Sequence, residues 1–154
     1  MDGLESLRHV LEEQKRHAES DSVDWEAEKQ CWVAANQKLI DKIAVWLRPL
    51  ADSGEGLLRL EQRYFDLDEE EFGPYQVVGL HLRAPSRREV DIRASGRWVL
   101  GAQGRVDIVS GSRTATLLRR KANEWVWARR QGGELRTESF DRDSLLSVLG
   151  EMLQ

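Results

Sequence analysis

One stretch of the sequence decides the fold: residues 4–47, which read LESLRHVLEEQKRHAESDSVDWEAEKQCWVAANQKLIDKIAVWL. It contains neither glycine nor proline, whereas eleven of the twelve glycines fall after residue 53 and the first proline is Pro49. Glycine and proline are the residues that most often end regular elements. The asymmetry therefore predicts a long helix followed by a turn-rich, strand-rich region.

The division along the chain follows from this asymmetry. Residues 1–50 are expected to form a helical segment for oligomerisation or partner binding, 51–56 a linker, and 57–154 an antiparallel β domain with a C-terminal helix. At roughly 1.5 Å per residue, the long helix would span roughly 65–70 Å, which is more than the width of a small domain. Part of it must project, fold back or pair with another chain.

In the helical stretch every seventh residue is apolar, and these residues form a stripe along the helix. Counted from Leu4, these residues are Leu4, Leu11, Ala18, Trp25, Trp32, Leu39 and Trp46. The companion positions three residues further on are mostly polar, whereas a regular coiled coil needs both sets apolar. The pattern favours a long amphipathic helix that lies on another surface. We expect Leu4, Leu11, Trp25 and Trp32 to bind a partner, since tryptophan is enriched at interfaces; packing in the chain's own core is the alternative.

The weakest helical stretch is residues 20–24, Ser-Asp-Ser-Val-Asp. Short polar side chains compete for the backbone and prefer helix caps, so Asp21 or Ser22 could begin a second helix. Two interpretations therefore stay open: one continuous helix, or two helices joined by a turn near 20–24. Arg48 and Pro49 should end the helix, because the residue before proline is pushed out of the helical region.

Turn signals recur at short intervals after residue 57 and separate short β-prone runs. The expected strands lie near 57–66, 75–83, 88–94, 97–101, 105–110, 113–119, 124–129 and 134–138. This regular spacing predicts an antiparallel meander sheet or a small barrel of about seven strands. Ser95-Gly96 reads as a tight hairpin turn between two of them. In the order and count of its elements, the outline is similar to a pleckstrin-homology-like barrel, which has seven strands and one capping helix.

The chain ends in a second predicted amphipathic helix. Asp141 is a good N-cap, and Phe140 with Leu145 can form a hydrophobic staple around it. The apolar face that follows should pack on the sheet or on the long helix. The predicted fold class is therefore α+β.

Signatures of catalysis and of metal binding are missing from the sequence. It contains no glycine-rich phosphate loop, no nucleophile elbow and no zinc-protease motif. His9 and His17 are eight residues apart, which does not give the pair of ligands found four apart in helical metal sites. Cys31 is the single cysteine and is expected to be a packed thiol. We therefore expect no enzyme activity, no catalytic residues, no bound metal and no cofactor.

Charge is distributed unevenly, although the net charge is only -4. Residues 73–136 carry 13 basic and 5 acidic side chains, while both ends of the chain are acidic. If alternate turns of the meander share one end of the sheet, five of these basic residues could converge on an anion: Arg87, Arg88, Arg119, Arg120 and Lys121. Nucleic acid or another anionic ligand is the partner that such a cluster would bind.

Two functions from different classes follow. The first is a non-enzymatic adaptor that self-associates, as a dimer, or binds a protein partner through its N-terminal helix. The alternative is a nucleic-acid or anionic-ligand binding protein that uses the arginine-rich turns. Residues 1–5 lack the pattern of a signal peptide and no apolar run is long enough to span a membrane, so a cytoplasmic location without membrane insertion is expected.

Overall fold

The computed structural model of the chain describes residues 3–51, 55–96, 103–121 and 123–154, with only the backbone described for 17–24. Helix α1 (Gly3–Leu47) opens the chain and passes into a short 3-10 turn, η1 (Arg48–Leu50). Seven strands and a second helix, α2 (Arg142–Leu153), follow. The strands are β1 (Arg59–Glu69), β2 (Gly73–Arg83), β3 (Glu89–Gly96), β4 (Arg105–Ser110), β5 (Arg113–Lys121), β6 (Glu124–Gln131) and β7 (Glu134–Ser139).

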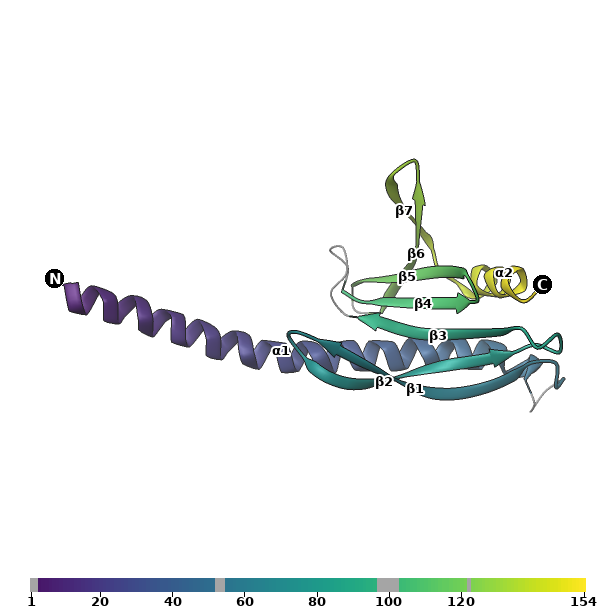
Figure 1. Cartoon of the computed structure of the whole chain (residues 1–154), viewed down its shortest axis with the longest axis horizontal. Helices are drawn as coiled ribbons and strands as arrows, with labels where there is room; N and C mark the ends of the chain where they lie inside the picture. Colours follow the sequence, from purple (N-terminus) through teal and green to yellow (C-terminus); the bar gives the residue numbers. More distant parts are fainter. Residues whose placement is uncertain (1–2, 52–54, 97–102, 122) are drawn as a thin grey trace.

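The seven strands form one sheet in which each strand pairs antiparallel with the next along the chain. This confirms the predicted meander and the α+β class. Strands β1 and β7 stand at the two edges and do not pair with each other, so the sheet is open. Of the two predicted forms, the structure has the meander sheet and not the small barrel. In Figure 1 the β6–β7 hairpin rises away from the rest of the sheet, which leaves the two edges far apart.

Helix α1 runs without interruption through residues 20–24. The interpretation with two helices is therefore wrong, because the short polar side chains there do not outweigh the helix-forming residues on both sides. With 45 residues, α1 is about 68 Å long at 1.5 Å per residue. Its second half lies along the sheet, and its first half projects beyond every strand (Figure 1).

Two strands separate to make room for α1. Strands β2 and β3 pair only between Leu80–Arg83 and Glu89–Ile92, so the first part of β2 has no strand on that side. Helix α1 occupies the space. The Asn36 side-chain amide donates a 2.8 Å hydrogen bond to the carbonyl of Val78, a group that a strand would otherwise have bonded. The helix is thus fixed to the β1–β2 hairpin by a polar contact as well as by apolar packing.

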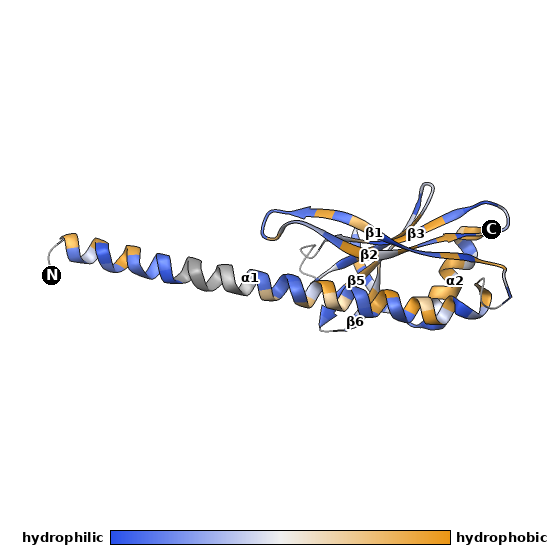
Figure 2. Ribbon diagram, turned by 90° about the horizontal axis from the view of Figure 1, so that it is seen from below, coloured by the Kyte–Doolittle hydropathy of each residue, from blue (hydrophilic) through white to orange (hydrophobic). Residues whose placement is uncertain are grey.

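The buried face of α1 follows the helical period in its second half. Its members recur at three- and four-residue steps, and they are Trp32, Ala35, Asn36, Leu39, Ile40, Ile43 and Leu47. In Figure 2 apolar residues recur along this half of α1, where the helix runs beside the sheet. Five of the buried residues, Trp32, Leu39, Ile40, Ile43 and Leu47, belong to one core cluster with residues of β2, β3, β4, β5, β6 and α2. The helical segment and the β domain therefore share a core, while part of the expected 51–56 linker lies outside the described residues.

Trp32 is the largest fully buried side chain of that core. Its indole nitrogen donates a 3.0 Å hydrogen bond to the hydroxyl of Tyr75 on β2, and its ring lies 6.2 Å from that of Trp125 on β6. Gly104, with a φ of 154°, leaves the space for the indole, because a Cβ there would come within 2.3 Å of the ring. The curved sheet thus surrounds α1 at this point with residues from distant strands.

Helix α2 begins where the sequence predicts. Asp141 is the N-cap, and its side chain accepts a 2.7 Å hydrogen bond from the Ser144 amide. Phe140, just before it, packs against Trp46 of α1 and Trp127 of β6, at centroid distances of 5.6 and 5.5 Å. The cap therefore sets the point at which the chain turns from β7 onto the core.

Replacing Asp141 by alanine should lower the free energy of unfolding by about 1 kcal/mol, since it removes the acceptor for a helix amide. In a chain of this size this corresponds to a fall of about 2–4 °C in the thermal midpoint, measured by circular dichroism. Asp143→Ala in the first turn of α2 is the control and should change the midpoint by less. Equal midpoints for Asp141→Ala and the unaltered protein would contradict the capping role.

Seven of the eight expected strands are present, and the expected strand at 97–101 lies outside the described residues. The prediction of a tight hairpin turn at Ser95-Gly96 is wrong. Both residues belong to β3, whose register with β4 shifts between Ala94 and Gly96, and Gly96 pairs with Arg105. The glycine therefore supports an irregularity within a strand, a use that the sequence pattern does not separate from a two-residue turn.

Candidate protein-interaction site

The first four turns of α1 carry an apolar surface that the protein does not bury. Every side chain from Gly3 to Arg16 is exposed. Four large apolar residues among them form the N-terminal stripe: Leu4, Leu7, Val10 and Leu11, with exposed fractions of 67%, 55%, 48% and 53%. Leu4, Leu7 and Leu11 are spaced by three and four residues, so they share one face of the helix. A shallow hollow of about 340 Å³ follows this face and is also lined by Arg8, Glu12 and Lys15.

The charges around the N-terminal stripe balance. Residues 3–16 contain three acidic and three basic side chains. His9 and Glu13 lie 4.0 Å apart, one turn from each other and outside the positions of the stripe. A neutral segment with an apolar face can approach a second copy of itself without net repulsion.

The two tryptophans that were expected to bind a partner have intramolecular roles. Trp32 is buried in the chain's own core, which corrects the expectation for this residue. Trp25 is half-buried, and its ring meets the edge of Phe72 in the β1–β2 turn at 6.2 Å. The separation of β2 from β3 brings this hairpin to the helix, and the sequence pattern does not reveal that separation. Leu4 and Leu11 remain as the exposed members of the predicted set.

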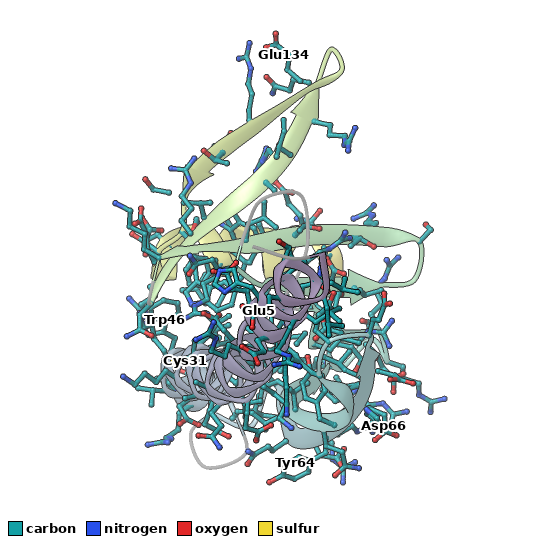
Figure 3. All side chains as sticks on the ribbon, turned by 90° about the vertical axis from the view of Figure 1, so that its left-hand side faces the viewer. Glu5, Cys31, Trp46, Tyr64, Asp66 and Glu134 are labelled. Atoms are coloured by element: carbon teal, nitrogen blue, oxygen red, sulfur yellow. The ribbon has the colours of Figure 1, made fainter. Side chains whose placement is uncertain are left out.

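Cys31, next to Trp32, is exposed, so the expectation of a packed thiol is wrong. Adjacent helical residues point about 100° apart, and the sheet covers only the side of α1 that Trp32 occupies. Figure 3 places Cys31 on the side of α1 that faces away from the labelled residues of β1, Tyr64 and Asp66.

The five basic residues proposed as an anion site do not converge. Arg87 and Arg88 lie in the turn between β2 and β3, whereas Arg119, Arg120 and Lys121 lie where β5 ends. Because β3 pairs directly with β4, these two places are at opposite ends of the sheet (Figure 1). The predicted convergence assumed one more strand between these two turns, which would have placed both turns at the same end of the sheet.

Two members of that set also have intramolecular partners. Arg119 is buried, and its guanidinium donates to the carbonyl of Gln103 at 3.3 Å. The guanidinium of Arg120 donates to the Thr137 hydroxyl at 2.7 Å. Trp125 and Trp127 on the neighbouring strand β6 are buried, so they offer no exposed ring on which a nucleic-acid base could stack.

Two polar groups lie on the face of the sheet opposite the helices. His81 is buried and contacts Asp91 at 2.6 Å and Glu89 at 3.4 Å. Asp107, also buried, accepts hydrogen bonds from Ser95, from Arg105 at 3.0 Å and from Thr116 at 2.8 Å. Asp91 and Asp107 lie in different clusters, so they do not form a carboxylate pair. Within the described part of the chain, no group of histidine, cysteine and carboxylate residues could hold a metal ion.

A third polar group joins α1 to the tip of the β1–β2 hairpin. The hydroxyl of Tyr75 accepts from Trp32 and donates to the carboxylate of Glu69. Burial of the phenol raises the pKa of Tyr75, and its hydrogen bond to Glu69 raises it further. Tyr75 therefore stays neutral and links Trp32 of α1 to Glu69 of the hairpin through its hydroxyl.

One surface was missed by sequence reasoning. A groove of about 550 Å³ lies between β5, β6 and α2, and among its lining residues are Arg113, Trp127, Arg129, Arg130, Val148, Glu151 and Met152. The sequence shows the arginines in turns but does not show that the hairpin β6–β7 rises from the sheet beside α2. The signal that could have located them is strand alternation, which places Arg129 on the same face as Trp127.

In the two described helices, no stretch is both long enough and apolar enough to cross a membrane. Comparisons with models of protein families, with curated proteins and with solved structures found no match to this chain.

Proposed function

We propose that the protein is a non-enzymatic interaction module that self-associates through the N-terminal stripe of α1. The observation that carries the proposal is the exposure of Leu4, Leu7 and Leu11 on a helix that projects beyond the sheet (Figure 1). Single exposed apolar residues are common, but a row of them on one helix face is typical of an interaction site. The β domain then serves as the anchor that keeps this helix formed and directs it outward.

The charges beside the stripe favour a parallel pair of helices. With Leu4 and Leu11 at the first heptad position, Arg8 and Lys15 occupy the fifth and Val10 the seventh. In a parallel pair the fifth position faces the seventh of the partner helix, so Lys15 meets Val10. In an antiparallel pair the fifth positions face each other, which brings Arg8 against Lys15. A parallel dimer avoids this repulsion and places both β domains at the same end.

The dimer should be weak. The apolar repeat covers about two heptads, fewer than the three or four of a stable coiled coil, and Gln14 interrupts it. We expect a Kd in the micromolar range, since only a small apolar surface offsets the entropy lost on association. The proposal places the protein in the cytoplasm, where the exposed thiol of Cys31 would stay reduced.

Replacing Leu7 and Leu11 together by glutamine should weaken self-association at least tenfold. Glutamine keeps the helix propensity and removes only the apolar surface. Sedimentation velocity between about 1 and 100 µM protein would measure the effect, with the unaltered protein passing from monomer to dimer over this range. The matched control is His9→Gln with Glu13→Gln, which changes two residues outside the stripe and should leave the dimer unchanged.

Two results would contradict the proposal. One is an unaltered protein that stays monomeric throughout the range, which would favour a different protein as the partner of the stripe. The other is a Leu7→Gln, Leu11→Gln variant that associates as the unaltered protein does, which would place the contact elsewhere. Thermal unfolding of the variant should be unchanged, because the stripe contributes nothing to the core, and this separates lost association from lost folding.

A further inference from the structure

We infer that the groove between β5, β6 and α2 is a binding site for a small organic anion with an apolar group. Its volume of about 550 Å³ lies within the range of small-molecule sites, about 300–1,000 Å³. Trp127, Val148 and Met152 provide an apolar wall, and three arginines, Arg113, Arg129 and Arg130, accompany a single carboxylate, Glu151. This site is separate from the N-terminal stripe and does not depend on self-association.

Two arginines beside the groove lie directly opposite each other in the sheet, and their charges repel when no anion is bound. Arg129 of β6 pairs directly with Arg136 of β7, so the two guanidinium groups leave the same face of the hairpin. Like charges opposite each other destabilise a sheet. One carboxylate, Glu138, lies 3.6 Å from Arg129, and Glu134 lies at the tip of the hairpin (Figure 3). A bound anion would relieve the repulsion between Arg129 and Arg136.

The arginines divide into those with intramolecular partners and those without. Arg113 donates to the backbone carbonyl of Glu151 near the end of α2, at 2.8 Å, and Arg129 pairs with Glu138. Among the residues that the structure describes, neither Arg130 nor Arg136 has a carboxylate partner. Guanidinium groups bind carboxylate and phosphate through two parallel hydrogen bonds. Arg129 and Arg136 share the face of the hairpin that carries Trp127, so they are the pair suited to an anionic ligand beside the groove.

The apolar wall indicates that the ligand carries more than its charge. Trp127 is buried, and its indole nitrogen donates to the Ser144 hydroxyl at 2.8 Å, which fixes the ring at the base of the groove. Val148 of α2 is half-buried, and Met152 is buried. An aromatic or aliphatic group would lie against these residues while the anionic group reaches the arginines. Small-molecule sites also combine apolar side chains with polar groups that fix the orientation of the ligand.

Phenyl phosphate is the probe that combines the two features. Inorganic phosphate has the charge without the ring, and phenol has the ring without the charge. The indole N–H signal of Trp127 in a proton–nitrogen correlation spectrum reports on the groove, and its loss in Trp127→Phe identifies it. We expect a saturable shift of this signal with phenyl phosphate, with a Kd of about 1 mM or lower, and binding at least tenfold weaker for the other two probes.

Arg129→Gln with Arg136→Gln should weaken phenyl phosphate binding at least tenfold, and added salt should weaken it as well. The matched control is Arg87→Gln with Arg88→Gln, which removes the same charge from the turn between β2 and β3 and should change binding by less than about twofold. Among the described residues, the tested arginines have one carboxylate partner, Glu138, which forms an exposed ion pair with Arg129. Exposed ion pairs contribute little to stability, so the fold should be retained, which thermal unfolding would show.

Three results would overturn the inference. No saturable shift below about 10 mM phenyl phosphate would exclude a site of this kind. An equal loss of binding in both double variants would indicate attraction by overall charge. Inorganic phosphate binding as tightly as phenyl phosphate would show that the apolar wall takes no part. The Leu7→Gln, Leu11→Gln variant should bind phenyl phosphate normally, which distinguishes failure of this site from failure of self-association.

Discussion

Replacing Trp32 by alanine should lower the free energy of unfolding by about 4 kcal/mol, because it removes the largest fully buried side chain of the core. The loss has three parts. The indole contacts with Trp125 and Gly104 disappear, the hydroxyl of Tyr75 loses a donor, and a cavity remains between α1 and the sheet. A domain of this size has a stability of about 5–15 kcal/mol, so the variant would keep only part of it.

Denaturant unfolding followed by circular dichroism would measure this change. Trp25→Ala is the informative comparison, since the same residue type seven positions earlier makes an edge contact with Phe72 and is only half-buried. We expect a cost of about 1 kcal/mol for it. Leu11→Ala should cost almost nothing, because Leu11 is exposed. If Trp25→Ala and Trp32→Ala were equally destabilising, the burial pattern of α1 described above would be incorrect.

Replacing Gly79 by alanine should destabilise the protein by about 3 kcal/mol, the upper part of the usual range for overpacking. Gly79 is buried in β2, and a Cβ there would lie 2.5 Å from the carbonyl oxygen of Ile92 and 2.5 Å from the ring of Phe65. A ring can rotate away, but the carbonyl belongs to the backbone of β3. The sheet must therefore shift where β2 begins to separate from β3.

Gly150→Ala provides the matched control for this substitution. Gly150 lies in α2 with nothing within 4 Å of an added Cβ, so alanine should stabilise the helix by about 0.5–1 kcal/mol. Thermal and denaturant unfolding of the two variants should move in opposite directions. The double variant Gly79→Ala, Phe65→Ala tests the obstacle itself. Stability no worse than that of Phe65→Ala alone would show that the ring, and not the Ile92 carbonyl, opposes the substitution.

The repeating elements of this fold were predictable because they depend on local patterns. The absence of glycine and proline defined α1, the spacing of turn residues defined the meander, and Asp141 defined the start of α2. Each signal acts within a few residues of the element that it specifies, so no long-range information was needed.

The candidate sites were harder to predict because they depend on where elements meet. Leu11 and Trp32 occupy equivalent positions in the apolar repeat, yet one is exposed and the other is buried, since the sheet reaches only the second half of α1. Successive turns of a meander lie at alternate ends of the sheet, so the end at which an arginine lies depends on how many strands precede its turn. A prediction that counts one strand too many therefore places the later arginines at the wrong end. The Ser95-Gly96 pair produced that error, because glycine permits both a turn and a strand irregularity.

The separation of β2 from β3 has a consequence for how the chain folds. Every strand of the meander pairs with its neighbour in sequence, and two of the connections, at Gly111-Ser112 and Gly132-Gly133, are only two residues long. The contacts of α1 with β2 are different, since Trp32 and Tyr75 are 43 residues apart. Closing such a loop costs more entropy than forming a hairpin. The sheet can therefore assemble by local steps. Docking of α1 is non-local, since Trp32 contacts Tyr75 of β2 and, still further along the chain, Trp125 of β6, so it raises the contact order and should slow folding.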